Sequence, residues 1–429
     1  MNGGETNGVD VHGIVAGGLA GLDLRGKRVL VIVPDGTRTA PIGLVFRPVW
    51  ARLTEAGAAQ IDVMVALGTH QPMSEDAIRR RIGITAEEHA TTYREVRLLN
   101  HAWDDPARLA PLGTIPAAEI AELTGGLFAE GVPVTFSRPA LGYDRLVIIG
   151  PVFPHEVVGF SGGNKYLFPG ISGPEVLNFF HWLGAVITSP RVMGHKWTAV
   201  RAVVDRAAAL VPVPVTAFCL VVRPHGDGEH HEHPDGALAG LFAGEVRDAW
   251  SRAADLSATQ HIVTVPRPFR TVLACAPAMY DEIWVGAKCM YKLEPVVADG
   301  GELIIYAPHI RGFAVTHDAA IRRIGYHTRD YFLKQWDRFK NEPWGVLAHS
   351  THVRGVGTFE DGVEKPRIAV TLATGIPEAE CRAVNLGYRD PATIDPAAFA
   401  GREDEGILMV PRAGEMLYRL ADPPAWATP

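Results

Sequence analysis

The segment RVLVIVPDGTRTAPIGLVFRPVWARLTEAGAAQIDVMVAL (residues 28–67) decides the fold class. It starts with a short β-branched run that ends in a turn, which is typical of a buried parallel strand. Apolar residues then recur with helical spacing around 43–56, and a second apolar run covers 61–67. A strand, a helix and a strand with short connections form a βαβ unit, so the segment predicts an α/β fold with a parallel-rich sheet.

The rest of the chain repeats this pattern and indicates two α/β domains. The run RLVIIG (145–150) is a further buried strand. The two prolines of PRPFR (266–270) can continue neither a helix nor a central strand, so we place the domain boundary there. We predict an N-terminal domain at 1–266, completed by the segment 400–429, and a C-terminal domain at 267–399.

Composition excludes several classes of protein. The chain has 429 residues, which is more than one hydrophobic core usually supports. Its formal charge of −7 argues against a nucleic-acid-binding surface. No apolar run reaches the roughly 18 residues of a membrane span. The four cysteines form no CxxC pair, so we expect a cytoplasmic protein with neither a disulfide framework nor a thiolate zinc site.

Polar residues follow the first two predicted strands, where open α/β sheets place their ligands. The loop PDGTRTAP (34–41) contains Asp35, Thr37 and Arg38, and it can either hold a phosphate or carboxylate or form an Asx-type turn that caps the next helix. The second strand leads into GTH, with His70 at its tip. A lone histidine is more often structural than catalytic, so this motif alone decides nothing.

The richest segment is PHEVVGFSGGNKYLFPGISG (154–173), after the strand RLVIIG. It combines His155, the turn Ser161-Gly162-Gly163 and Lys165. Paired glycines allow close approach of the backbone to an anionic group, and the lysine can neutralise a phosphate or act as a nucleophile. The GxxxxGK[ST] spacing of a P-loop is absent. A glycine-rich loop with a solvated lysine is the non-functional alternative.

Three other histidine positions allow metal binding. His181 lies in an apolar helical stretch, where it is either a buried imidazole bonded to a carbonyl or a ligand for nickel, copper or zinc. The loop HGDGEHHEH (225–233) lies at the tip of a predicted β-hairpin, which favours a solvated, adventitious site. His349 and His352 are three residues apart and have no third ligand near them in sequence.

Taken in order, DGTR, GTH, PHE with SGGNKYLFPGISG, a helical histidine and GAK resemble the nickel-dependent lactate racemase family over most of the chain. The glycine-lysine segment is the specific part of this resemblance. The family has two α/β domains with a cleft between them, so the resemblance implies that the active site of this chain lies in an interdomain cleft. It uses a nickel-pincer nucleotide, which is a pyridinium mononucleotide joined to a lysine through a thioamide.

The resemblance assigns a role to each of these positions. It implies that Lys165 carries the cofactor covalently and that His181 is the protein ligand to nickel. It implies that His70 and His155 form the acid–base pair. The remaining positions are implied to line the cofactor and substrate site: Asp35, Thr37, Ser161, Gly162 and Gly163 toward the cofactor, and Arg38, Lys288 and Trp284 toward the substrate.

The implied reaction is the racemisation or epimerisation of a 2-hydroxy acid. The hydrogen on a hydroxyl-bearing carbon beside a carboxylate is too weakly acidic for a histidine to remove. Inversion is easier when a base takes the hydroxyl proton while hydride leaves to the cofactor, because the planar keto acid can then receive hydride on its other face. The two enantiomers present their hydroxyls differently, so two bases are needed, and imidazole has a suitable pKa.

This chain departs from the lactate enzymes at three positions. Gln71 stands where the family often has arginine, and Trp284 and Val285 replace a tyrosine and a glutamine. The pocket therefore lacks polar groups expected for lactate, and we expect a larger or more apolar 2-hydroxy acid.

Two other classes of function remain open at this point. Lys165 can form a Schiff base in a lyase or aldolase without metal, or the chain can bind a nucleotide or phosphate without catalysis. For partners we expect a small-molecule substrate, cofactor-synthesis enzymes and a possible homo-oligomer, and neither nucleic acid nor a membrane.

Overall fold

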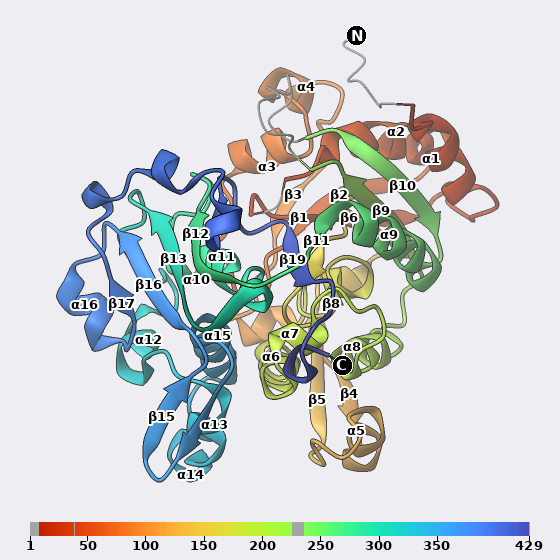
Figure 1. Ribbon diagram of the computed structural model, residues 1–429. Coiled ribbons are helices and arrows are strands. Elements are labelled where there is room, and N and C mark those ends of the chain that lie inside the picture. Colours follow the sequence, from red (N-terminus) through yellow and green to blue (C-terminus); the bar gives the residue numbers. More distant parts are fainter. Residues whose placement is uncertain (1–7, 38, 225–235, 429) are drawn as a thin grey trace. The chain divides into compact units, whose positions relative to one another are not determined.

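A computed structural model describes residues 8–37, 39–224 and 236–428, and these divide into two compact units (Figure 1). Unit 1 contains 8–153, 160–177 and 196–260, and unit 2 contains 154–159, 178–195 and 261–428. Both units have parallel-rich sheets, so the predicted α/β fold class is confirmed. Two short segments of unit 2, which contain His155 and His181, interrupt the sequence of unit 1, so the chain passes between the units several times.

Unit 1 is built on a six-stranded sheet with the strand order β10-β9-β6-β1-β2-β3. All neighbours are parallel except β9 and β10, which form the predicted hairpin. The tip of that hairpin, including 225–233, lies outside the described residues. The strands are β1 (Arg28–Pro34), β2 (Gln60–Ala66), β3 (Leu98–Asn100), β6 (Arg145–Pro151), β9 (Val215–Val222) and β10 (Leu238–Gly244).

Packing of apolar side chains explains why residues 28–67 form a strand, a helix and a strand. Alternate residues Val29, Val31 and Val33 of β1 pack into one core cluster with Val45 and Phe46 of the helix that follows. Side chains alternate across a strand and recur every three to four residues in a helix, so one apolar face of each meets the other. The helices of unit 1 are α1 (Val11–Leu19), α2 (Ile42–Glu55), α3 (Glu75–Arg81), α4 (Ala86–Ala90), α5 (Ala117–Leu123), α8 (Ala199–Ala208) and α9 (Val246–His261), the last residue of which belongs to unit 2.

Smaller elements lead the chain to the glycine-lysine loop, and β7 among them belongs to unit 2. Before them, β4 (Leu109–Ile115) pairs antiparallel with β5 (Val132–Ser137), with α5 in the connection. After β6, the short strands β7 (Pro154–His155) and β8 (Gly159–Phe160) pair with each other, and a 3₁₀ turn covers Gly163–Tyr166. This turn contains Lys165.

Unit 2 has a five-stranded, wholly parallel sheet with the order β17-β16-β13-β12-β18. Its strands are β12 (Phe269–Cys275), β13 (Val297–Ala307), β16 (Ala369–Thr374), β17 (Gly387–Tyr388) and β18 (Ile407–Val410). Two small sheets accompany it: β11 (Ile262–Val265) with β19 (Leu417–Leu420), and β14 (Gly357–Glu360) with β15 (Val363–Pro366). The helices are α6 (Pro174–Ile187), which begins in unit 1, α7 (Ser189–Val192), α10 (Ile283–Gly286), α11 (Lys288–Tyr291), α12 (Asp318–Ile324), α13 (Arg329–Leu333), α14 (Trp336–Phe339), α15 (Trp344–Arg354) and α16 (Glu378–Ala383).

The C-terminal segment lies in a different unit from the one that we predicted. Residues 400–429 were expected to complete the N-terminal domain, but β18 extends the sheet of unit 2 beside β12, and β19 pairs with β11. The physical reason is that β12 needs a parallel neighbour on its second edge, and the buried residues of β18 provide it. The chain changes unit at His261, close to the predicted boundary at 266.

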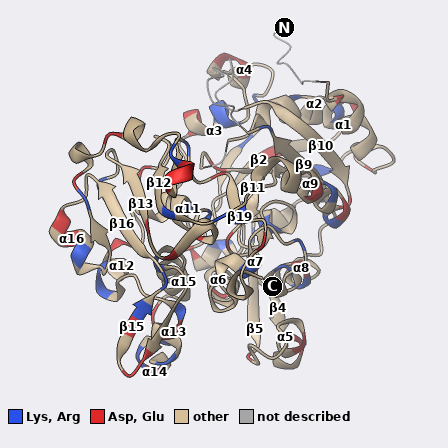
Figure 2. Ribbon diagram, viewed as in Figure 1, with Lys and Arg blue, Asp and Glu red and all other residues tan. Residues whose placement is uncertain are grey.

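Charged residues of both signs are interspersed over both units (Figure 2). Within the described residues, none of the helices combines the length and the apolar character that a bilayer span requires.

Candidate active site

The first part of the site lies where β1 and β2 end. The two strands are parallel and Pro34 pairs with Ala66, so the loops that follow them leave the same edge of the sheet. There the Nδ1 atom of His70 hydrogen-bonds to Oδ2 of Asp35. The Thr37 backbone N–H and hydroxyl both donate to the other carboxylate oxygen, Oδ1, at 3.0 and 2.7 Å. Asp35 therefore forms the Asx-type turn and also orients His70.

Asp35 stays ionised in this setting. Burial by itself would raise the pKa of the Asp35 carboxyl, but the neighbouring His70 and the hydrogen bonds from His70 and Thr37 outweigh it and hold the pKa well below its ordinary value. An ionised carboxylate only accepts hydrogen bonds, so His70 donates its Nδ1–H to Asp35. In the neutral form of the ring the lone pair then lies on Nε2, and the His70 side chain is 33% exposed.

The glycine-lysine loop is joined to the same edge of the sheet. The Gly68 N–H, in the GTH loop, donates to the Gly170 carbonyl at 3.1 Å, and the Gly170 N–H donates to the Lys165 carbonyl at 3.1 Å. Gly162 and Gly163 have φ values of +83° and +59°. A Cβ at Gly163 would lie 2.9 Å from Trp250, so only glycine fits this turn.

Two helices hold the backbone in front of Lys165. Arg201 of α8 donates to the carbonyls of Phe160 and Gly162, and the Trp250 indole N–H donates to the Ser161 carbonyl at 2.9 Å. The Arg201 guanidinium is 4.1 Å from the centre of the Trp250 ring. Burial lowers the pKa of Arg201 to about 10, so it remains charged at neutral pH. Successive carbonyls of the loop are thus fixed by one buried cation and one indole.

The sequence analysis did not identify Arg201 and Trp250, which bind the loop carbonyls. Arg201 is 1% exposed and lies in the Ala/Val-rich helix AVRAVVDRAA together with Asp205, which accepts from the Asn164 amide at 3.0 Å. The sequence signal that could have indicated them is the arginine and aspartate, four residues apart, in an otherwise apolar helical stretch. The Ser161 hydroxyl accepts from the Phe153 N–H at 2.9 Å, so it helps to hold the loop, and its role as a cofactor ligand stays a prediction.

His155 is a buried histidine of unit 2 with two different partners. It is 4% exposed and lies at the end of β7. Its Nδ1 accepts the Val157 N–H at 3.1 Å, and the same atom is 3.2 Å from Oε2 of Glu156. The first contact suits a neutral ring with its proton on Nε2, and the second suits a protonated ring that donates from Nδ1. His155 therefore has a partner in either protonation state.

His181 lies on α6, and its ring stacks against Phe180 with the centroids 5.1 Å apart. The next residue, Trp182, is 1% exposed and stacks on Trp336 at 5.5 Å, which anchors this helix in unit 2. His181 is only half-buried. No group of three or more His, Cys, Asp or Glu in the described parts of the chain is placed to hold a metal ion by itself.

The predicted substrate residues of unit 2 lie in an aromatic setting. Lys288 is 6% exposed, and its Nζ is 4.8 Å from the centre of the Tyr280 ring. Trp284 contacts the rings of His317 and His349, with centroids 4.5 and 4.3 Å away. Burial, followed by the effect of His352 and His317, lowers the pKa of His349 well below its ordinary value, so His349 is neutral. His349, to which the sequence analysis gave no role, thus packs together with His317 against the ring of Trp284.

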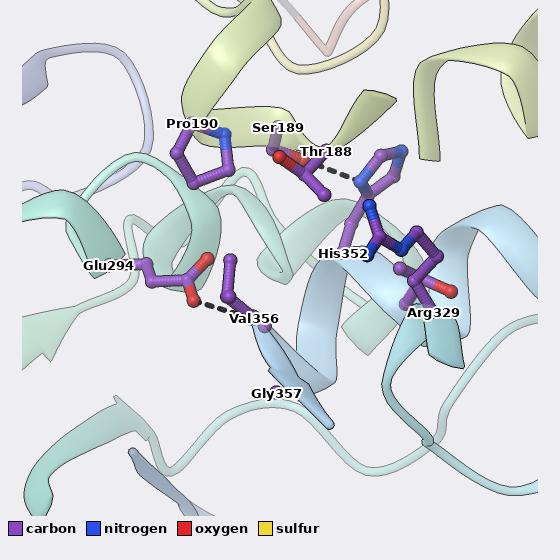
Figure 3. A pocket seen from close by; sticks show the side chains of 10 residues that line it. Thr188, Ser189, Pro190, Glu294, Arg329, His352, Val356 and Gly357 are labelled. Atoms are coloured by element: carbon purple, nitrogen blue, oxygen red, sulfur yellow. Dashed lines mark hydrogen bonds between the residues drawn. The ribbon is translucent and has the colours of Figure 1, made fainter. Parts of the chain in front are cut away.

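His352 lies in a separate small cavity of about 30 Å³ (Figure 3). Its Nδ1 is 2.5 Å from the Ser189 hydroxyl, and on another wall Glu294 accepts from the Val356 N–H at 2.6 Å. A space of that size holds one or two water molecules. His349 and His352 therefore lie in different surroundings, although they are three residues apart on α15.

The structure brings the predicted residues together in two sets. Unit 1 contains the set at the ends of β1, β2 and β6, which consists of Asp35, Thr37, His70, Ser161, Gly162, Gly163 and Lys165. Unit 2 contains His155, His181, Trp284 and Lys288. Arg38 lies outside the described residues. The predicted cleft that would join the two sets stays a prediction.

Comparison with known proteins gives these residues a family context. Residues 16–193 match the model of the lactate racemase N-terminal domain. A lactate racemase from Lactiplantibacillus plantarum is 27% identical over 288 residues, which are 66% of this chain and 61% of that protein. A lactate racemase from Thermoanaerobacterium thermosaccharolyticum is 22% identical over 152 residues, which are 35% of this chain and 31% of that protein. The matches thus span less than two thirds of these curated relatives.

Two solved structures are similar over nearly the whole chain. A protein from Thermotoga maritima has a TM-score of 0.85 and 33% identity, covering 96% of this chain and 97% of its own. The lactate racemase apoprotein from Thermoanaerobacterium thermosaccharolyticum has a TM-score of 0.71 and 16% identity, covering 98% and 97%, and shows that the fold is shared. The matched residues 16–193 include the Asp35–His70 pair and the Lys165 loop as well as His155 and His181. Residues 16–193 of this chain therefore match the lactate racemase N-terminal domain, and nearly the whole chain shares the fold of a lactate racemase.

Proposed function

We propose that this protein is a racemase or epimerase of a 2-hydroxy acid other than lactate, and that it works with a nickel-pincer nucleotide attached to Lys165. The observation that carries the proposal is the pair formed by ionised Asp35 and His70 beside the Lys165 loop. An imidazole that is oriented by a carboxylate and left with a free lone pair is equipped to take a hydroxyl proton.

The residues of unit 1 suit such a nucleotide. A Cβ placed on Gly36 or on Gly68 would meet no atom within 4 Å, so there is open space beside the backbone at two of the three strand ends. Carboxyl ends of parallel strands are the usual place for nucleotides in α/β sheets. Lys165 lies on the third loop at that edge, with its backbone held by Arg201 and Trp250.

His181 of unit 2 suits the nickel of the same nucleotide. His181 offers one imidazole, and the absence of a three-residue metal cluster among the described residues is expected if the other donors belong to the cofactor. Imidazole and soft sulfur donors together suit nickel. When bound, the group would supply an electron-poor carbon that accepts the substrate's hydride.

The two histidines supply the proton transfers. His70 has its lone pair on Nε2, so it accepts the hydroxyl proton of one enantiomer. In its doubly protonated form His155 directs Nδ1–H to Glu156 and donates its Nε2 proton to the oxygen of the opposite enantiomer; it is left neutral, and its Nδ1 then accepts the Val157 N–H. Glu156 is the acceptor available when His155 is doubly protonated. In the reverse reaction the two roles exchange.

The aromatic surroundings of Trp284 bear on the choice of substrate. The Trp284 indole and the His317 imidazole are both half-buried and offer flat ring faces, which suit a side chain larger than a methyl group. Lys288 and Arg38 would hold the carboxylate. We further propose a small-molecule substrate, enzymes that synthesise the cofactor and a homo-oligomeric assembly as partners.

A panel of chiral 2-hydroxy acids tests the proposed function. Protein loaded with the cofactor is expected to equalise the enantiomers, or epimers, of at least one acid with a side chain larger than that of lactate, and to act more slowly on lactate. Polarimetry and chiral chromatography measure the change, with cofactor-free protein as the control. The proposal fails if the loaded protein changes no acid, or if borohydride traps an imine at Lys165 during turnover without nickel.

Single histidine substitutions test the two-base arrangement. With an acid that the wild type racemises, His155→Ala is expected to form bound keto acid from one enantiomer only, and His70→Ala from the other. Racemisation by each variant is expected to fall by about 10²- to 10⁴-fold, the usual contribution of a general base. Acid quenching followed by chromatography measures the keto acid per cofactor. Keto acid formed from both enantiomers by either variant would contradict the assignment.

A further inference from the structure

Unit 2 contains a second cavity, of about 120 Å³, which none of the residues assigned to the candidate active site lines. Its walls come from segment 190–195, from Pro295 and from the C-terminal segment 417–428. Most of the lining side chains are apolar, including Pro190, Met193 and Leu417. For comparison, an engineered apolar cavity of roughly 150 Å³ accepts benzene. The space therefore suits a ligand body of about four or five carbon atoms.

One cation lies in this apolar wall. Arg419, on β19 next to Leu417 and Leu420, donates through Nη2 to the Met193 carbonyl. No aspartate or glutamate within residues 8–37, 39–224 and 236–428 forms an ion pair with it, and burial lowers the pKa of its guanidinium. Arg419 is partly buried, and a charge withdrawn from water is normally paired, because its lost hydration is otherwise uncompensated. The guanidinium has further donors beyond the one that Met193 uses.

The cavity is shaped around this guanidinium. A Cβ added to Gly194 would lie 2.8 Å from Arg419 Nη2, and Gly194 has a φ of +74°, so glycine leaves room for the cation. His195 also lines the cavity. Burial and the charge of Arg419 lower the pKa of His195 to about 4, so it is neutral at pH 7. The cavity therefore combines one positive charge, one neutral imidazole and an apolar body.

We infer that this cavity is a binding site for a small aliphatic carboxylate, whose carboxylate pairs with Arg419 and whose hydrocarbon part fills the space between segments 190–195 and 417–428. An arginine fork matches a carboxylate in shape and charge. An uncharged ligand of the same shape would leave the guanidinium unpaired, and a cation would be repelled. The inference does not depend on the proposed racemase function.

Isovalerate tests the inference, with isovaleramide as its uncharged analogue and isoamylamine as its cationic analogue. We expect saturable binding of isovalerate to the full-length protein by calorimetry, together with a rise in melting temperature, because the ligand contacts three separate segments. Isovaleramide is expected to bind at least tenfold more weakly, and isoamylamine not at all. Absence of saturable isovalerate binding, or equal binding of acid and amide, would overturn the inference.

Three variants locate the binding. Arg419→Met keeps the length of the side chain without its charge and is expected to weaken isovalerate binding at least tenfold. Ala427→Leu keeps Arg419 but fills the cavity, and it should abolish binding even if Arg419→Met folds poorly. Lys288→Met removes a cation implied to bind carboxylates in the candidate active site, and it should leave isovalerate binding unchanged. Loss of binding in Lys288→Met, with binding retained in Arg419→Met and in Ala427→Leu, would place the carboxylate elsewhere.

Discussion

Lys165→Met is expected to abolish both attachment of the cofactor and racemisation. Methionine matches the length of the lysine side chain but has no amine, so it cannot form an amide-type link. The backbone around residue 165 should be preserved, because Arg201, Trp250 and the Gly170 N–H hold it through carbonyl groups and not through the lysine side chain. The effect should therefore be chemical, with the fold unchanged.

Intact mass spectrometry of protein loaded with the cofactor measures this result. The wild type should carry the mass of the adduct, and Lys165→Met should have the mass of the polypeptide alone, with an unchanged circular dichroism spectrum. Lys27→Met is the matched control, because Lys27 lies in the same unit in an exposed pair with Asp23 at 3.5 Å. An adduct of unchanged mass on Lys165→Met would show that the attachment point lies elsewhere.

Asp35→Asn is expected to lower the rate of racemisation by about 10²- to 10⁴-fold while the cofactor stays attached. The reason lies in Thr37, whose N–H and hydroxyl both donate to Oδ1 of residue 35. This position must remain an oxygen, so the NH₂ group of asparagine would face His70 and donate to Nδ1. The ring proton of His70 would then move to Nε2, and the base would lose its lone pair.

Enzyme kinetics together with intact mass spectrometry separate this effect from loss of cofactor. We expect a fall in kcat with the adduct mass retained and the melting temperature changed by little. Asp23→Asn is the control, because Asp23 is exposed and forms an ion pair with Lys27 at the surface. Racemisation by Asp35→Asn at a rate within a few-fold of the wild type would mean that Asp35 does not set the tautomer of His70.

The position of the unit 1 site was predictable because it follows from local periodicity and chain order. Alternating and helically spaced apolar residues indicated β1, α2 and β2, and the carboxyl ends of parallel strands meet at one sheet edge. Asp35, His70 and the glycine-lysine loop were each expected at the end of a strand. The structure joins the first two by a hydrogen bond, and the Gly68–Gly170 bond joins the loop to the same edge.

Other features depend on contacts between residues far apart in the chain, which no local pattern encodes. Arg201 and Trp250 meet the carbonyls of Phe160 and Ser161 across about 40 and 90 residues, and neither position has a motif. The surroundings of Trp284 also depend on His317 and His349, which belong to two later segments.

The α/β class, the strand-end loops and the residue types in them could be read from the amino-acid sequence, since these depend on short-range periodicity. Three features required the folded chain: the C-terminal segment joins the sheet of unit 2, Thr37 and Asp35 together orient His70, and Arg419 lines a mostly apolar cavity, where it donates to the Met193 carbonyl. Those outcomes depend on which distant segments bury each other's surfaces, and burial is a property of the packed chain as a whole.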